Sequence, residues 1–367
     1  MAELRRFGDF ATFKYGKMPD KKKLTESGKY PVYSGYRYVG YYDEYNTEAN
    51  QIIVVARGVG GTGDVKLTKE RCYLTNLSIS ADIDENIALP EFIYYYYLQH
   101  NLRYLDSGSA QSQITISDLE KVMIPLPSLG EQRAICGYMK MLDRKIEINE
   151  AVNENLQAQS FAIFDNLIST SASELVPLSY IAELNPKRQL SKGVTARCID
   201  MSALSTTSTF PSGWEMKSYN GGMRFANGDT IIARITPCLE NGKTAYIDFL
   251  DESEVAFGST EYIVISSRGA FPSEFFYCLA RYPSFVDYAV VNMNGSSGRQ
   301  RVSADILGKY CLPLLTEKEV SVFANTVPAL FRLMRNNSLE NLRLASLRDS
   351  LLPRLMSGEM DVSAQDL

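Results

Sequence analysis

The feature that most constrains this chain is a long stretch with a seven-residue hydrophobic period, which runs from Leu129 to about Leu167. Its apolar positions advance by alternating steps of four and three residues, the spacing of a helix that buries one narrow seam. The pattern therefore predicts a long coiled-coil helix. Its seam consists of Ile135, Met139, Leu142, Ile146, Asn149, Asn153, Leu156, Ser160, Ile163 and Leu167.

A second seam with the same steps lies 188 residues further along the chain. Its polar interruptions recur as well, because Asn337 corresponds to Asn149 and Asn341 corresponds to Asn153. An asparagine in an apolar seam lowers stability, and its usual role is to fix the register and the partner of the helix. We therefore expect the two helices to pack against each other. The second seam consists of Phe323, Val327, Leu330, Met334, Asn337, Asn341, Leu344, Arg348, Leu351 and Leu355.

The segments that precede the two helices also repeat. Glu3-Leu4 has a counterpart in Glu174-Leu175 at an offset of 171, whereas residues directly before the helices correspond at 188. The second copy therefore holds about 17 additional residues, which we interpret as loop. Short β-branched runs, Ile52–Ala56 and Thr230–Ala233, predict one buried strand in each copy, and each run is followed by an arginine.

These repeats predict an α+β fold. Two globular α/β domains, related by the internal repeat, are expected to be joined and separated by two long antiparallel coiled-coil helices with pseudo-two-fold symmetry. Pro90–Arg103 and Pro272–Tyr282 start with proline and carry aromatic stripes, so each predicts a shorter helix. Pro328 should kink the second long helix or mark its first turn. The expected order is domain 1 at 1–126, long helix 1 at 127–170, domain 2 at 171–314, long helix 2 at 315–357 and a C-terminal tail at 358–367.

The composition indicates a globular protein in a reducing compartment. Of the 367 residues 45% are hydrophobic and 22% are charged, which is enough apolar material for two ordinary cores. We find no apolar run of about 18 residues and no apolar signal-peptide core behind the charged N-terminus. Six cysteines are scattered without a CxxC pair. The sequence therefore predicts a cytoplasmic protein without a membrane partner.

The motifs that could support catalysis are incomplete. Gly58–Gly63 matches GxGxxG, but a strand pattern follows it where a dinucleotide site needs a helix. Gly242-Lys243-Thr244 resembles the end of a P-loop, but Pro237 stands where the loop needs its first glycine. The single histidine, His100, is expected to face solvent. We predict no catalytic residue, no metal site and no cofactor bound by this chain.

Polar and basic segments at equivalent places in the two domains suit contacts with nucleic acid. Gln and Asn side chains can pair with adenine and Arg with guanine, while Lys, Ser and backbone N–H groups suit phosphates. Ordinary solvated loops have the same composition, so both interpretations remain open. The candidates in the first domain are Lys17, Lys21, Lys22, Lys23, Tyr36, Arg37, Tyr38, Arg57, Ser109, Gln111 and Gln113. Those in the second are Lys187, Arg188, Arg224, Arg234, Lys243, Asn294, Ser296, Ser297, Arg299, Gln300 and Arg301.

The junction before the first long helix resembles a known family. Ile114 to Leu119 followed by Ile124 to Gln132, leading into a long helix, is similar to the boundary motif of DNA specificity subunits of Type I restriction-modification systems. The second copy is similar but has Leu315 in place of the second proline and Val320 in place of the glutamine. The resemblance covers essentially the whole chain, because the family shares the order domain, helix, domain, helix.

The resemblance implies a non-catalytic reader of double-stranded DNA. Each target-recognition domain would read half of a bipartite sequence, and the helices would act as a spacer. Two modification subunits carrying S-adenosylmethionine would dock on the chain, followed by restriction subunits that use ATP and Mg²⁺. A tandem-domain scaffold that binds protein remains an alternative. Charged residues beside the seams would meet these partners or simply be solvated: Arg144, Lys145, Glu147, Arg332, Arg335 and Arg343.

Overall fold

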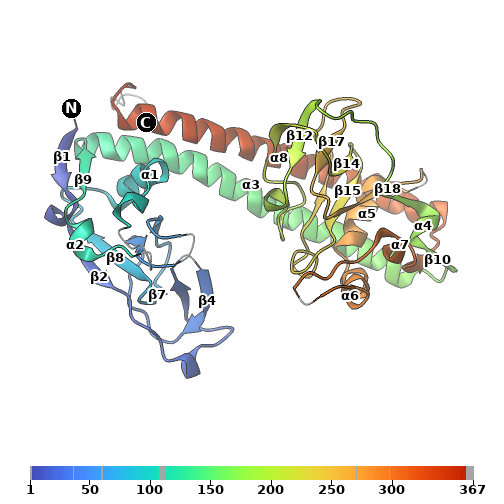
Figure 1. The fold of residues 1–367 in the computed structure, drawn as a ribbon, viewed down its shortest axis with the longest axis horizontal. Helices are drawn as coiled ribbons and strands as arrows, with labels where there is room; N and C mark the ends of the chain where they lie inside the picture. The colour runs from blue at the N-terminus through green and yellow to red at the C-terminus, as the bar shows by residue number, and fades with distance from the viewer. Residues whose placement is uncertain are drawn as a thin grey trace. The chain divides into compact units, whose positions relative to one another are not determined.

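Two long helices, α3 (Leu129–Thr170) and α8 (Glu317–Met356), dominate the computed structural model (Figure 1). The structure describes residues 2–35, 37–58, 61–106, 113–269, 271–296 and 298–360. The chain forms two compact units. Unit 1 comprises Met1–Arg144 with Ala345–Leu367, and unit 2 comprises Lys145–Leu344, so each unit includes part of both long helices.

The described residues of unit 1 form two sheets and a two-stranded ribbon. One sheet has the strand order β2-β8-β5-β6 and is antiparallel throughout. In the other, β4-β3-β7, strand β3 runs antiparallel to β4 and parallel to β7. The ribbon pairs β1 with β9. The strands are β1 (Glu3–Arg6), β2 (Ala11–Tyr15), β3 (Tyr30–Ser34), β4 (Arg37–Tyr42), β5 (Ile52–Val55), β6 (Val65–Leu67), β7 (Tyr73–Leu74), β8 (Ser78–Ile83) and β9 (Met123–Leu126). The short helices are η1 (Phe7–Asp9), η2 (Lys21–Lys23), α1 (Pro90–Gln99), η3 (Arg103–Leu105) and α2 (Ile116–Leu119).

Unit 2 repeats this architecture. Its sheets have the orders β11-β18-β15-β16 and β13-β12-β17-β14, and its ribbon pairs β10 with β19. The strands are β10 (Leu175–Pro177), β11 (Ala182–Leu184), β12 (Thr195–Ile199), β13 (Glu215–Ser218), β14 (Met223–Phe225), β15 (Thr230–Ala233), β16 (Thr244–Tyr246), β17 (Ala256–Gly258), β18 (Tyr262–Ser267) and β19 (Cys311–Pro313). The short helices are α4 (Leu178–Ile181), η4 (Met201–Ala203), α5 (Ser273–Ala280), α6 (Pro283–Val291) and α7 (Ala304–Leu307).

The matching strand orders confirm the predicted α+β fold with an internal repeat. The strand β12 pairs in parallel with β17, as β3 does with β7 in unit 1. Strand β14 pairs with β17, and the corresponding place in unit 1 has an isolated antiparallel bridge between Thr47 and Cys72. The interpretation of the additional residues as loop stays a prediction. The predicted shorter helices are too long at their C-terminal ends, since α1 ends at Gln99 and α5 at Ala280.

The two long helices begin with the same capping arrangement. Before α3, the Ser128 N–H donates to the Glu131 carboxylate at 2.8 Å, and the Glu131 N–H donates back to the Ser128 hydroxyl at 3.3 Å. Before α8, Thr316 and Glu319 make the same pair of bonds at 2.7 and 3.3 Å. Each capping box satisfies two groups that would otherwise lack partners at a helix start, and it fixes where the helix begins.

Gln132 anchors the start of α3 to unit 1. Its side chain is fully buried, and its amide donates to the backbone oxygens of Ile87 and Pro127 at 3.2 and 2.9 Å. Its carbonyl accepts from the N–H of Leu89, just before α1, at 2.9 Å. Val320 at the equivalent position of α8 cannot make these bonds, so the loss of the glutamine in the second copy removes a polar anchor rather than a helix start.

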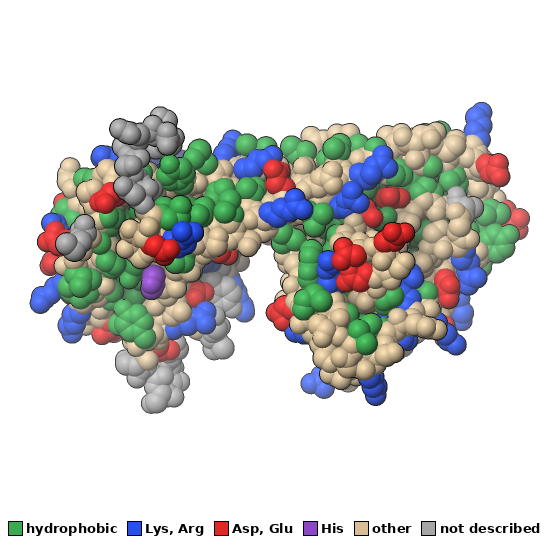
Figure 2. All heavy atoms as spheres, turned by 90° about the horizontal axis from the view of Figure 1, so that it is seen from above, with side chains coloured by type: hydrophobic (Ala, Val, Ile, Leu, Met, Phe, Trp, Pro, Cys, Tyr) green, Lys and Arg blue, Asp and Glu red, His purple; other side chains and the backbone are tan. Residues whose placement is uncertain are grey.

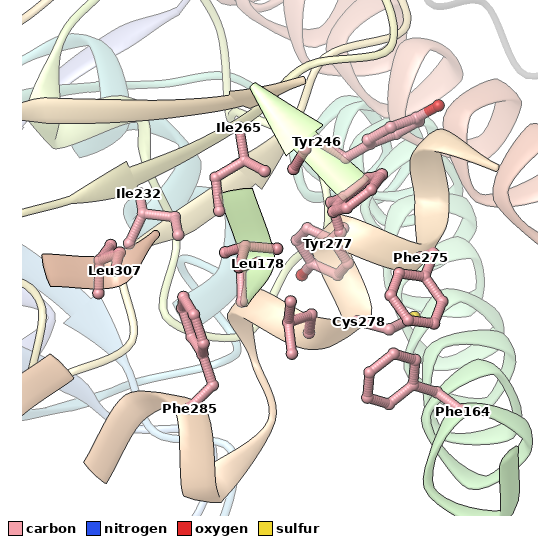
Figure 3. Packing of buried hydrophobic residues seen from close by; sticks show 14 of the residues in the cluster. Phe164, Leu178, Ile232, Tyr246, Ile265, Phe275, Tyr277, Cys278, Phe285 and Leu307 are labelled. Atoms are coloured by element: carbon pink, nitrogen blue, oxygen red, sulfur yellow. The ribbon is translucent and has the colours of Figure 1, made fainter. Parts of the chain in front are cut away.

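The largest core of unit 2 lies where α5 is covered by α3 on one side and by the β11-β18-β15-β16 sheet on the other. Phe164 of α3 packs on Phe275 of α5, with ring centroids 5.0 Å apart. Figure 3 shows these rings near Cys278 and Tyr277, with Ile232 of β15 and Ile265 of β18 on the sheet side. The fully buried aromatic rings explain the stripe seen in the sequence of α5, which is core packing.

The core of unit 1 follows the same plan. Ile52 of β5 and Phe92 of α1 are buried together with Ile135 and Met139 of α3 and Leu352 of α8. The α3 and α8 segments of unit 1 are also linked by an ion pair between Asp143 and Arg348 at 2.9 Å. The helix segments therefore belong to the cores of the domains and are not separate rods.

The polar interruptions of the two seams meet inside unit 2. Asn149 donates to the side-chain oxygen of Asn341 at 2.8 Å, and Asn337 donates to that of Asn153 at 2.9 Å. Because the earlier residue of one helix contacts the later residue of the other, the two helices run antiparallel, as predicted. Every seam residue is buried or half-buried.

Pro328 lies well inside α8, which starts at Glu317. The prediction that this proline marks the first turn is therefore wrong. A proline at this position lacks the N–H that would donate to the carbonyl of Ala324, one turn earlier. The buried neighbours Val327 and Phe331, both part of the unit 2 core, hold the helix across this gap.

Candidate nucleic-acid interface

Basic candidates of unit 1 surround the small β4-β3-β7 sheet. Lys21, Lys22 and Lys23 form the exposed helix η2, which Asp20 caps by accepting the N–H of Lys22 at 3.0 Å. Thr25, just after η2, exchanges backbone hydrogen bonds with Tyr41 on β4 at 3.2 and 2.9 Å. The fold thereby brings the lysines to the strand that carries two further candidates, Arg37 and Tyr38.

We call this group the β4 surface. Tyr38 is 51% exposed, and its ring packs edge-on against that of Tyr41. The N–H of Lys17 bonds to the backbone oxygen of Leu74 on β7, so its exposed side chain starts at the other edge of the same sheet. Exposed lysines next to an exposed aromatic ring can hold phosphates and stack on a base. The β4 surface consists of Lys17, Lys21, Lys22, Lys23, Arg37 and Tyr38.

Arg57 and Gln113 lie at a second place in unit 1, where they form a backbone bridge. The N–H of Gln113 donates to the Asp106 carboxylate at 2.9 Å. The Nε atom of Arg57 is buried and has no hydrogen-bond partner among the described residues. Four predicted candidates lie outside the described residues: Tyr36, Ser109, Gln111 and Ser297.

Arg188 in unit 2 is held by an internal partner. Its Nε and Nη2 atoms bond to the two carboxylate oxygens of Asp229 at 2.9 and 2.5 Å. The Asp229 side chain is 1% exposed, and burial raises the pKa of its carboxyl while the bonds from Ala226 N–H and Arg188 oppose this rise. A bidentate pair of this kind fastens the segment after β11 to the start of β15.

The other basic candidates of unit 2 differ in their surroundings. The Nζ atom of Lys243 donates to the backbone oxygen of Met201 at 2.8 Å, so this lysine links the start of β16 to η4. Lys187 is exposed, and Arg224 on β14 is half-buried. The exposed candidates of the 294–301 loop are Asn294, Ser296 and Arg299.

Arg234, Glu261 and Arg301 form a cluster where β15 ends and β18 begins. The guanidinium of Arg301 donates from Nε and Nη2 to the Glu261 carboxylate at 2.9 and 2.7 Å. Arg234 is farther from this carboxylate, with Nε 3.9 Å from Oε2. The hydrogen bonds from Arg301 lower the pKa of the Glu261 carboxyl. Gln300 contributes its backbone oxygen to the N–H of Thr236 at 3.1 Å.

Sequence reasoning missed Glu261. It precedes the apolar run of β18 and reads as an ordinary charged residue at a strand start, 40 residues from Arg301. The sequence also suggested that Arg57 and Arg234 are equivalent residues, because each directly follows a β-branched run. The backbone registers differ by one residue, because Ile114 N–H bonds to the oxygen of Ala56 while Val302 N–H bonds to that of Arg234. Ala56 is thus the counterpart of Arg234, and the two arginine side chains start on opposite faces of the extended chain.

The charged residues beside the seams have several internal partners. The Nζ atom of Lys145 lies 3.1 Å from the Glu340 carboxylate, and Arg335 pairs with Asp248 at 3.2 Å. Arg332 and Arg343 are exposed. Figure 2 shows basic side chains interspersed with acidic ones over the visible face, with the single histidine, His100, at the surface of unit 1.

The described residues contain no group of three or more His, Cys, Asp and Glu side chains placed to hold a metal ion. Within the same residues, none of the helices combines the length and the hydropathy that a membrane span requires.

The chain is similar to known proteins of one kind. A family described as "Type I restriction modification DNA specificity domain" matches residues 2–158. The Type I restriction enzyme HindI specificity subunit of Haemophilus influenzae is 22% identical over 75% of this chain and 78% of its own length. The EcoAI specificity subunit of Escherichia coli is 33% identical over 35% of this chain and 23% of its own length.

A solved structure supports the fold. The S subunit of a Type I restriction-modification system from M. genitalium superposes with a TM-score of 0.64 at 20% identity, covering 96% of this chain and 95% of that one. The similarity to the HindI subunit and to the M. genitalium structure covers 75% and 96% of this chain, so it includes parts of both repeated halves. The chain is therefore similar, over most of its length, to Type I restriction-modification specificity subunits.

Proposed function

We propose that this chain is the sequence-reading subunit of a Type I restriction-modification complex and that each unit reads one half of a bipartite DNA target. The observation that carries the proposal is the repetition of one fold, with corresponding strand orders in both units, in a chain that is similar to this family. Two copies of one reader with different loop residues suit a target made of two different halves.

The exposed candidates supply suitable chemistry for each half-site. The β4 surface of unit 1 offers lysines for phosphates and a tyrosine ring for stacking. The 294–301 loop of unit 2 offers an exposed arginine and polar side chains next to Arg301. Phosphate contacts would position each unit, and base contacts would select the sequence.

The long helices are proposed to set the distance between the half-sites. The helix α3 has 42 residues and α8 has 40. At about 1.5 Å per residue a helix of this size is about 60 Å long, which exceeds one DNA turn of about 34 Å. Their exposed residues, such as Arg332 and Arg343, are proposed to meet partner subunits.

The chemistry is proposed to reside on those partners. Two modification subunits would carry S-adenosylmethionine and methylate the target, and restriction subunits would use ATP and Mg²⁺. This chain would contribute neither catalysis nor a cofactor, and its place would be the cytoplasm, where it meets DNA. The alternative is a tandem-domain protein scaffold, which would bind partners through the helices and show no salt-dependent affinity for DNA.

The experiment is to sequence host DNA for methylated bases with the gene present and with the gene deleted, while the modification subunits remain expressed. The proposal expects methylation at one bipartite motif in the first strain and its loss in the second. An unchanged methylation pattern would contradict the reader function. A titration of the complex against DNA at two salt concentrations then tests the scaffold alternative.

A further inference from the structure

Gln113 in unit 1 and Arg301 in unit 2 occupy the same backbone position. The residue after each of them donates its N–H to the segment that follows β5 or β15. Ile114 donates to the oxygen of Ala56 at 2.9 Å, and Val302 donates to the oxygen of Arg234 at 3.0 Å. Each also forms a backbone bridge to the next residue of that segment, Arg57 or Ile235. The side chains at 113 and 301 therefore leave equivalent places of the two folds.

The guanidinium of Arg301 is held along one edge. Its Nε and Nη2 atoms donate to the carboxylate of Glu261, and its Nη1 atom donates to the backbone oxygen of Arg299 at 3.0 Å. A guanidinium has five N–H donors, so these bonds leave one on Nη1 and one on Nη2. The end-on fork formed by Nη1 and Nη2 matches the O6 and N7 acceptors of guanine in the major groove. The side chain is 37% exposed, so it is accessible to a ligand.

The corresponding pair in unit 1 has a different chemistry. Leu77 accepts the N–H of Ala56 at the place where Glu261 accepts that of Arg234, so Leu77 is the counterpart of Glu261. Unit 1 thus has Leu77 and Gln113 where unit 2 has Glu261 and Arg301. A glutamine amide offers one donor and one acceptor to a base, which matches N7 and the amino group of adenine.

We infer that positions 113 and 301 are equivalent base-reading positions, that Arg301 reads a guanine in the half-site of unit 2, and that Gln113 reads an adenine in the half-site of unit 1. Glu261 is a positioning residue, because it holds the Arg301 fork in place without facing the base itself. This inference rests on the proposed DNA-reading function and assigns residues within it.

The test compares variants of the full chain, assembled with the modification subunits, by methylation sequencing and by DNA titration. Arg301→Gln should lose preference for one guanine of the second half-site by about 10- to 100-fold. Glu261→Gln should weaken the same preference while total affinity stays or rises, because a negative charge near DNA is removed. The pair Glu261→Leu with Arg301→Gln copies unit 1 and should shift the preference towards adenine. The first half-site should not change.

Two further variants serve as controls. Glu254→Gln removes a carboxylate that pairs with Arg197 and is 20% exposed, close to the 26% of Glu261, so it should alter stability without altering base preference. Arg301→Lys keeps the charge but loses the fork, and it replaces Arg301→Gln if that variant does not fold.

Several outcomes would overturn the inference. An unchanged second half-site in the Arg301 variants would remove this residue from base reading. A uniform loss of affinity on all sequences, with a salt dependence lowered by about one phosphate contact, would make Arg301 a phosphate ligand. If the wild-type complex itself prefers no bipartite sequence, the proposed function fails first and the inference falls with it.

Discussion

At the scale of single residues, the arginines of unit 2 divide into those that serve the fold and those that remain available. Arg188 is fixed by a carboxylate that is 1% exposed, whereas Arg299 is exposed in the 294–301 loop. The sequence predicted the residue types of the candidate site but could not separate these two groups. The separation depends on acidic partners such as Asp229, 41 residues away, whose position is fixed only by the folded sheets.

Loss of the Arg188–Asp229 pair should destabilise unit 2 strongly. Arg188→Ala leaves the buried Asp229 carboxylate unpaired, and we expect a loss of about 3–5 kcal/mol in the free energy of unfolding. Urea unfolding followed by the fluorescence of the single tryptophan, Trp214, reports on unit 2. The control is Lys217→Ala, which breaks an ion pair with Asp200 at 2.7 Å. This lysine is 42% exposed, so its loss should destabilise the unit much less than the loss of Arg188. Equal losses in the two variants would contradict this view of Arg188.

At the scale of elements, the long helices were predictable and the sheets were only partly so. A seven-residue period over 40 residues is a strong signal, so the sequence located both α3 and α8. The strands β5 and β15 are recognisable as apolar runs, but β7, with two residues, and β14, with three, carry too little pattern. Their pairing, including the parallel β12–β17 pair, depends on contacts between distant segments.

The asparagines of the seam should show strong coupling. Asn149→Leu leaves the half-buried Asn341 without the bond that it makes at 2.8 Å, so we expect destabilisation by about 1–3 kcal/mol. The double variant with Asn341→Leu replaces both partners by apolar groups and should recover most of that loss. A double-mutant cycle by urea unfolding measures the coupling. Additive losses would show that this hydrogen bond does not stabilise the helix pair.

The starts of the long helices should be sensitive to acid. The hydrogen bonds from Ser128 lower the pKa of the Glu131 carboxyl, and those from Thr316 lower the pKa of the Glu319 carboxyl. A carboxyl whose pKa is lower in the folded state stabilises that state above its unfolded pKa, about 4.3, and this contribution is lost as the pH falls through the folded pKa.

Helix content followed by circular dichroism should therefore fall with pH in the acid range below about 4.3. The combined variant Ser128→Ala with Thr316→Ala removes the hydroxyl partners and should flatten this pH dependence. If the variant and the wild type follow the same acid curve, the capping boxes do not control the helix starts.

At the scale of the whole chain, the order of elements repeats while the loop residues differ. Each copy closes with a two-stranded ribbon, β1 with β9 and β10 with β19, directly before its long helix. The sequence revealed this repeat because the junctions match at a constant offset. It could not assign bases to the two units, since that assignment requires knowing which loop side chains are held and which are accessible.

Exchange of residues 1–126 should change half of the target. The segment ends with β9 and leaves α3, which starts at Leu129, intact. A chimera carrying the equivalent segment of another specificity subunit is expected to methylate a motif with a new first half and an unchanged second half. Methylation sequencing provides the measurement. Changes in both halves would show that the two units do not read independently.

The crosswise asparagine pairs also have an evolutionary consequence. Asn149 contacts Asn341, although its counterpart in the repeat is Asn337. Likewise, Asn153 contacts Asn337, although its counterpart is Asn341. A substitution of an asparagine in one copy of the repeat therefore affects a non-equivalent residue in the other copy. A change at one of these asparagines removes a hydrogen-bond partner from the other helix, so the two seams can keep these bonds only if they change together.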